Sequence, residues 1–117
     1  MKVAELMGAE LDYWAGIADG LNVEIALSGE CLLMDDNGDE ICDEYSPSTN
    51  WEYGGPIIER EKITIEPNPY GQKQWGACHG PHGKEPTWIW KNAETALIAA
   101  MRCFVASKFG DDVPNEA

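Results

Sequence analysis

The residues best suited to chemistry are a cysteine and two histidines that lie close together, Cys78, His79 and His82. Thiolate and imidazole are natural ligands of tetrahedral zinc, and Cys31 or Cys42 could complete such a set. The spacing argues against zinc, because ten residues separate Cys31 from Cys42 where zinc sites usually have two. Neighbouring cysteine and histidine residues also rarely bind the same ion. We therefore expect free thiols, no metal and no cofactor.

The same residues could serve a small hydrolase. A histidine could activate Ser48 with the help of an acid, or it could activate Cys78 directly. However, both histidines lie in a stretch rich in glycine and proline, and no nucleophile motif surrounds either candidate. We expect no enzymatic activity and keep the hydrolase as an alternative.

The acidic run from Asp35 to Glu40 suggests calcium at first sight. An EF-hand loop needs an oxygen ligand at its first position and a glycine at its sixth. Aligning Gly38 with that glycine places Leu33 first, which has no side-chain oxygen. The run instead predicts a solvated hairpin with an Asn-Gly turn between two short strands.

The stretch from Tyr45 to Arg60 is the least generic part of the chain. Ser48 or Thr49 could cap a short helix over 49–53, and Gly54-Gly55-Pro56 could allow a sharp bend. Hydroxyls and bare amides at a helix start can bind anions, but this stretch has no P-loop lysine and is flanked by glutamates. Five residues here are candidates for binding a ligand or partner: Ser48, Thr49, Asn50, Trp51 and Arg60.

Two further candidates are Trp88 and Trp90, which point to the same side if the backbone is extended. Two indole rings in one row could stack on a base or a sugar. They could equally cover the edge of the core, and this second interpretation is the one we favour.

The periodicity of apolar residues indicates the elements that hold these candidates. Three- and four-residue steps predict helices over 3–18, ending at Gly20, and from an Asn92 cap to Phe109, ending at Gly110. Alternation predicts strands over 23–27, 31–34, 63–66, 72–78 and 87–90. We expect one α+β domain over 1–117, with a mainly antiparallel sheet of four to five strands packed with the N- and C-terminal helices.

The charge distribution limits the partners of this chain. Fourteen Asp and Glu residues lie between Lys2 and Arg60 without one Lys or Arg among them, and the net charge is -13. Such a surface repels phosphate backbones and attracts basic protein faces. We expect no direct binding to nucleic acid, and no stretch is long enough to span a membrane.

Three stretches resemble the phage NinX family of small accessory proteins. They are Leu11-Asp12-Tyr13-Trp14, Ser46-Pro47-Ser48-Thr49-Asn50-Trp51 with Gly54-Gly55-Pro56-Ile57-Ile58-Glu59-Arg60, and the run from Ala96 to Lys108. Relatives tend to carry Gly-Pro-Thr-Pro where this chain has Asn92-Ala93-Glu94-Thr95, so this loop could set a different contact. The resemblance implies an α-β-α sandwich, a phage or prophage origin and the cytoplasm of an infected or lysogenic bacterium. It brings no catalytic residues.

The sequence thus favours a non-catalytic binding protein for a host or phage protein or for a small ligand. Tryptophan, tyrosine, serine and glycine in the candidate loops make adaptable contacts at low entropic cost. An acidic mimic of DNA that inhibits a nucleic-acid enzyme is the main alternative. A homodimer is the default assembly for a small protein of this kind.

Overall fold

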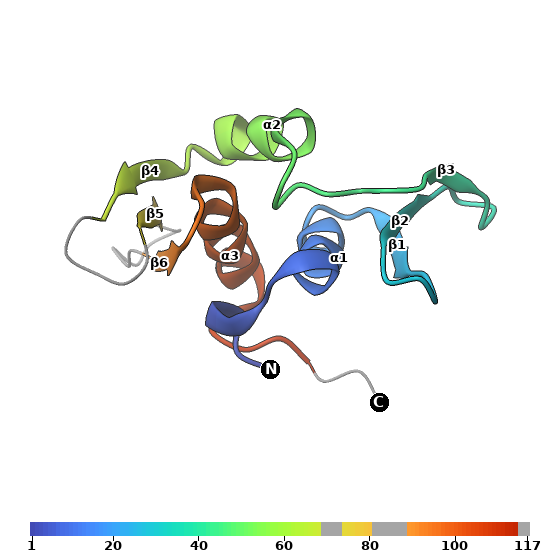
Figure 1. Cartoon of the computed structure of the whole chain (residues 1–117), viewed down its shortest axis with the longest axis horizontal. Helices are drawn as coiled ribbons and strands as arrows, with labels where there is room; N and C mark the ends of the chain where they lie inside the picture. The colour runs from blue at the N-terminus through green and yellow to red at the C-terminus, as the bar shows by residue number, and fades with distance from the viewer. Residues whose placement is uncertain (69–73, 81–88, 115–117) are drawn as a thin grey trace.

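The computed structural model describes residues 1–68, 74–80 and 89–114 (Figure 1). The elements follow one another as a 3-10 turn (Val3–Glu5), α1 (Gly8–Ala18), β1 (Asn22–Ile25), β2 (Cys31–Met34), β3 (Glu40–Cys42), α2 (Trp51–Glu61), β4 (Thr64–Pro67), β5 (Trp75–His79), β6 (Ile89–Ala93) and α3 (Ala96–Phe109). No helix in these described ranges is both long enough and apolar enough to cross a bilayer.

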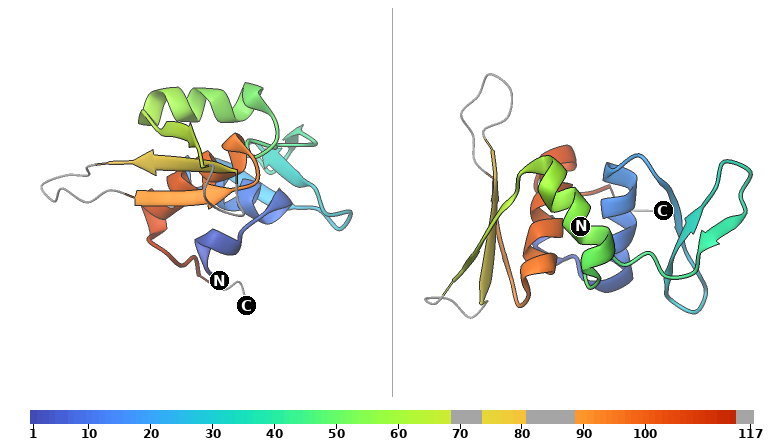
Figure 2. Two further views of the ribbon diagram at one scale, coloured as in Figure 1. Left: turned by 60° about the vertical axis from the view of Figure 1, so that its left-hand side comes forward. Right: turned by 90° about the horizontal axis from the view of Figure 1, so that it is seen from above.

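The strands form two antiparallel sheets, ordered β1-β2-β3 and β4-β5-β6. The sheets lie on opposite sides of α1 and α3, and α2 runs across the ends of both helices (Figure 2). The predicted α+β class is confirmed. The single sheet of four to five strands and the α-β-α layering were wrong, because the helices lie between two sheets.

The composition of α3 explains this layering. Nine of its residues are buried: Leu97, Ala99, Ala100, Met101, Arg102, Cys103, Phe104, Val105 and Ala106. A helix that is apolar on nearly every side must be covered on more than one side. Accordingly, α3 packs against β5 and β6 on one side and against α1 on the other.

The predicted first helix is broken into two pieces. The 3-10 turn ends at Glu5, Leu6 and Met7 are extended, and Gly8 has a φ of +57° at the start of α1. Val3 and Leu6 are nevertheless fully buried, like Leu11. The apolar period therefore continues through the break, and for this reason the sequence did not reveal it.

The helix ends were predicted with mixed success. Gly20 and Gly110 both have positive φ after their helices, as expected of C-terminal glycines. The cap of α3 was wrong: Asn92 lies in β6, and the Thr95 hydroxyl accepts a hydrogen bond from the Ile98 amide at 3.2 Å.

A helix forms in the predicted place but is longer than expected, and the predicted bend was wrong because Gly54, Gly55 and Pro56 all lie inside α2. A Cβ atom on Gly54 would overlap the carbonyl oxygen of Pro47 and lie 2.6 Å from Cδ2 of Leu97. Gly54 is therefore the point where α2 approaches both the preceding turn and α3.

The acidic run forms the expected hairpin between β2 and β3. One carboxylate oxygen of Asp35 accepts hydrogen bonds from the amides of Asn37 and Asp39, each at 2.9 Å. Gly38 has a φ of +84°, which a side chain would strain. The carboxylate of Asp35 thus organises the turn itself.

Candidate functional site

The turn before α2 is anchored by a buried carboxylate from α1. Asp12 is only 5% exposed, and its Oδ1 accepts a hydrogen bond from the Ser48 amide at 2.8 Å. Burial raises the pKa of Asp12, while the hydroxyl and amide of Ser48 oppose that rise. A contact across 36 positions therefore fixes the turn against the first helix.

Ser48 itself is 1% exposed. Its Oγ lies near the Asp12 carboxylate, but it forms no hydrogen bond of good geometry with any group in the described ranges. Buried hydroxyls usually have a partner, and the neighbouring Asp12 carboxylate is a group to which this one can donate.

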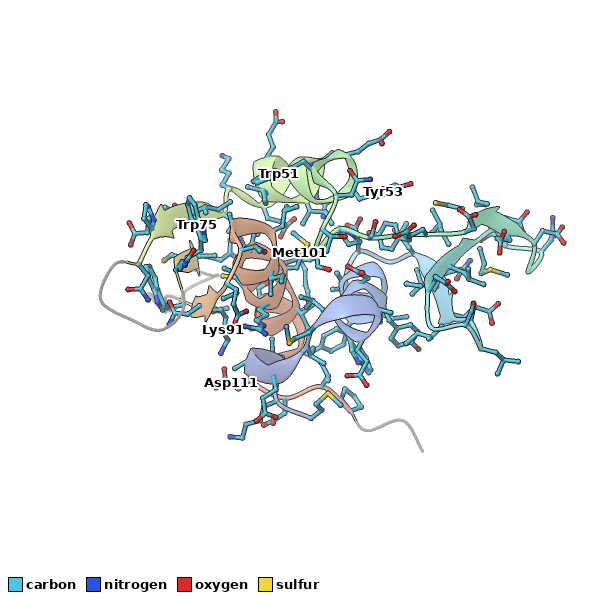
Figure 3. The ribbon with its side chains drawn as sticks, in the orientation of Figure 1. Trp51, Tyr53, Trp75, Lys91, Met101 and Asp111 are labelled. Carbon is cyan, nitrogen blue, oxygen red and sulfur yellow. The ribbon has the colours of Figure 1, made fainter. Side chains whose placement is uncertain are left out.

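A pocket of about 360 Å³ lies where this turn meets three other elements. Two tryptophans from different elements line it, Trp51 from α2 and Trp75 from β5, and we call it the two-tryptophan pocket. The full lining is Ser48, Thr49, Trp51, Trp75, Glu94, Thr95, Ala96 and Leu97. Figure 3 labels both tryptophans, above and beside α3.

Two local constraints bring these elements together. Trp75 pairs with Ala93 across the β5–β6 ladder, so Trp75 lies beside the start of α3. Gly54 lets the first turn of α2 approach Leu97 closely. The pocket is therefore formed by the N-terminal ends of two helices and one end of a sheet.

Among the described residues, Glu94 is the one charged residue that lines the pocket. Behind the pocket wall, Arg102 is 1% exposed and donates to the carbonyls of Leu6 and Asn92 at 2.9 and 2.8 Å. Burial lowers the pKa of Arg102, and the charge of Glu94 opposes this shift. The described part of the pocket lining thus carries one negative charge and no cation.

The structure brings together three of the seven predicted site residues, Ser48, Thr49 and Trp51. Trp51 is 56% exposed, so its ring is available to a partner. Asn50 is instead the N-cap of α2 and accepts from the Glu52 amide at 2.9 Å. It replaces the predicted caps, Ser48 and Thr49.

Two of the other predicted residues, Arg60 and Trp90, do not join this pocket. Arg60 lies at the far end of α2 and forms ion pairs with Asp19 and Glu61. Trp90 is on β6, where its indole NH donates to Asn92 Oδ1 at 3.0 Å and its ring covers Gly76. Trp88 lies outside the described residues, so the predicted pair with Trp90 is untested.

Sequence reasoning missed Trp75, Glu94 and Thr95 as site residues. Trp75 was placed in a strand but not assigned a role, since strand pairing could not be derived. Glu94 and Thr95 belong to the loop that departs from the NinX pattern, and that departure was the available signal. Asp12 belongs to the Leu11-Asp12-Tyr13-Trp14 motif of the NinX resemblance, but the sequence assigned it no role.

The cysteines do not form the zinc set considered from the sequence. Cys31 and Cys42 lie on the β1–β3 side and Cys78 on β5, with α1 and α3 between the two sheets (Figure 2). All four cysteines are free, and burial raises the pKa of Cys31 and Cys103 to about 12. Within the described ranges, no three potential ligands are grouped to hold an ion.

The two nucleophiles considered for a hydrolase lie on different parts of the fold, Ser48 in the turn before α2 and Cys78 on β5. Burial, followed by the charge of Glu66, raises the pKa of Cys78, which disfavours its thiolate. Ser48 lies beside Asp12, while His79 is on β5. His82 lies outside the described residues.

A second hollow, of about 320 Å³, lies on the β1–β3 side. Four acids contribute to it, Glu30, Glu40, Asp43 and Glu44, together with Ala26, Ser28 and Leu32. It is part of the negative region that the sequence predicted.

Comparisons with known proteins agree with the fold and the motifs. The sequence profile of the family described as "Bacteriophage P22, NinX" matches residues 2–108. No curated protein matches the chain. A crystal structure of a phage protein from Bacillus cereus ATCC 14579 superposes with a TM-score of 0.66 and is 16% identical, covering 87% of this chain and 92% of that one. That structure supports the fold, and the profile match shows that the chain belongs to the NinX family of phage proteins.

Proposed function

We propose that this chain is a non-catalytic binding protein that engages a host or phage protein through the two-tryptophan pocket. The observation that carries the proposal is the convergence of Ser48, Thr49 and Trp51 with Trp75 on one hollow. Exposed tryptophans beside a pocket are typical anchors of protein interfaces. We further propose that it acts in the cytoplasm of an infected or lysogenic host, and membership of a phage family supports this.

The test is a quantitative pull-down from host lysate, paired with a thermal-shift screen of small ligands. Trp51→Ala should lose the retained protein, because it removes the exposed ring of the pocket. Trp90→Ala is the matched control, since it removes a tryptophan that does not line the pocket. Equal retention by the Trp51→Ala protein would contradict the proposal, as would turnover of a substrate by the purified chain.

A second candidate is an acidic inhibitor of a nucleic-acid enzyme. It is favoured by the segment 22–44, which carries eight Asp and Glu residues and no Lys or Arg. Neutralising three acids of the hollow together, as Glu40→Gln, Asp43→Asn and Glu44→Gln, should abolish capture of a basic partner in this case. The same variant should leave capture unchanged if the two-tryptophan pocket is the binding site.

A further inference from the structure

We propose that the two-tryptophan pocket binds the guanidinium group of an arginine side chain presented by the partner protein. This inference rests on the proposed function and adds the chemical group that the site recognises.

The polar groups of the pocket suit a ligand that only donates hydrogen bonds. Ser48 Oγ is buried beside the Asp12 carboxylate, so a ligand in the pocket does not reach it. The Thr49 hydroxyl and the Glu94 carboxylate are the acceptors among the residues that line the pocket. A guanidinium has five N–H donors and no acceptor, so it can donate to both groups at once.

The apolar part of the pocket suits a flat cation. The face of an indole ring is electron-rich and attracts cations within about 6 Å of its centre. Trp51 and Trp75 supply two such rings from different elements. Arginine stacks on aromatic faces and is more weakly hydrated than lysine, so it loses less on entering such a site.

The charges of the pocket discriminate against anions. The starts of α2 and α3 would both favour an anion by their dipoles, but the Glu52 amide is already bonded to Asn50 Oδ1 and the Ile98 amide to Thr95 Oγ1. Glu94 adds a negative charge at the same place, and Arg102 is too buried to reach a ligand. The net charge of -13 further concentrates cations at the surface.

The experiment uses the full chain, labelled with nitrogen-15, and three capped tripeptides: Gly-Arg-Gly, Gly-Lys-Gly and Gly-citrulline-Gly. The indole resonances of Trp51 and Trp75 should shift and saturate with the arginine peptide. Lysine should bind more weakly, because it lacks the planar fork. Citrulline has nearly the same shape without the charge and should not bind measurably.

Glu94→Gln should weaken binding of the arginine peptide on the order of fivefold, because it removes the charge and keeps the shape. Glu52→Gln is the matched control, since Glu52 is exposed on α2 and does not line the pocket. Neither substitution removes buried apolar surface, so both proteins should fold.

Two results would overturn the inference. Equal binding of citrulline and arginine would mean that the pocket recognises a neutral flat group. Absence of any shift with arginine would exclude guanidinium recognition. In both cases the proposed function is judged separately by the Trp51→Ala pull-down, so the two failures can be told apart.

Discussion

The two sheets have the same number of strands but different relations to the core. In β4–β6, Ala77 and Ala93 are fully buried beneath α3. In β1–β3, Ile25 is 42% and Ile41 62% exposed, and Leu27 at the adjoining turn is fully exposed. The β4–β6 sheet contributes to the buried core, whereas the β1–β3 sheet leaves much of its surface exposed for charged residues and for contact with a partner.

This difference has a physical consequence for the acidic segment. Eight acids can occupy 22–44 because few of them must be removed from water there. The two-tryptophan pocket lies on the other side of the molecule, at the well-packed end of α3. Substitutions in both regions test whether the packed part around α3 carries most of the stability while the β1–β3 sheet tolerates change.

The largest effect is expected at Arg102. Arg102→Ala leaves the carbonyls of Leu6 and Asn92 without their donor and opens a cavity, so it should lower the free energy of unfolding by about 3 kcal/mol or more. Arg60→Ala is the control, because that exposed ion-pairing arginine should contribute no more than about 1 kcal/mol. Urea denaturation measures both; similar losses would contradict the assignment of Arg102 as the buried connection.

A pair of leucines compares the two regions directly. Leu11→Ala removes a fully buried side chain of α1 and should cost about 3 kcal/mol. Leu27→Ala alters a fully exposed residue and should change stability by less than about 0.5 kcal/mol. Thermal denaturation of both variants measures this difference, and a large loss at Leu27 would show that it is covered in solution.

A pair of adjacent glycines tests the approach of α2 to α3. Gly54→Ala should destabilise by about 2 kcal/mol, because its methyl group overlaps the Pro47 carbonyl and presses on Leu97. Gly55→Ala meets its nearest atom, in Trp51, only at 4.0 Å and should be neutral or slightly stabilising. Chemical denaturation measures both, and equal effects would contradict the close packing.

The smallest of these effects concerns Asp12. Asp12→Ala leaves the buried Ser48 amide unpaired and should cost about 1 to 2 kcal/mol. Asp12→Asn keeps an acceptor oxygen without the charge, so it should be tolerated near neutral pH.

The pH dependence of this pair has a defined sign. Burial raises the pKa of Asp12 above its ordinary value of 3.8, so the folded chain holds the proton more tightly than the unfolded chain. The free energy of unfolding therefore decreases as the pH rises from the pKa of Asp12 in the unfolded chain through its pKa in the folded chain. The stability of Asp12→Asn relative to the native chain should increase from about pH 4 to neutral pH, and a constant difference would contradict the buried charge.

Local chemistry predicted the hairpin at Asp35–Glu40, the glycine helix ends and the last helix, because each depends on neighbouring residues. Two sheets and the length of α2 could not be predicted, since both depend on distant contacts. Gly54 illustrates this: next to Pro56 it predicts a bend, but the proximity of Leu97 makes it a packing position.

The candidate site divides in the same way. Ser48, Thr49 and Trp51 were found because they share one unusual stretch of sequence. Trp75 and Glu94 reach the pocket through strand pairing and helix packing, which no local pattern encodes. Arg60 lies apart from the pocket because a helix of 11 residues carries it away from the start of that stretch.

Photocrosslinking in the bacterial host tests the central claim most directly. In one variant the photoreactive residue p-benzoyl-phenylalanine replaces Trp51 at the two-tryptophan pocket, and in a second variant it replaces Leu27 beside the β1–β3 sheet. Crosslinked proteins are identified by mass spectrometry. The account predicts a defined protein adduct from position 51 and none from position 27. An adduct from position 27 alone would contradict it and would assign binding to the acidic sheet.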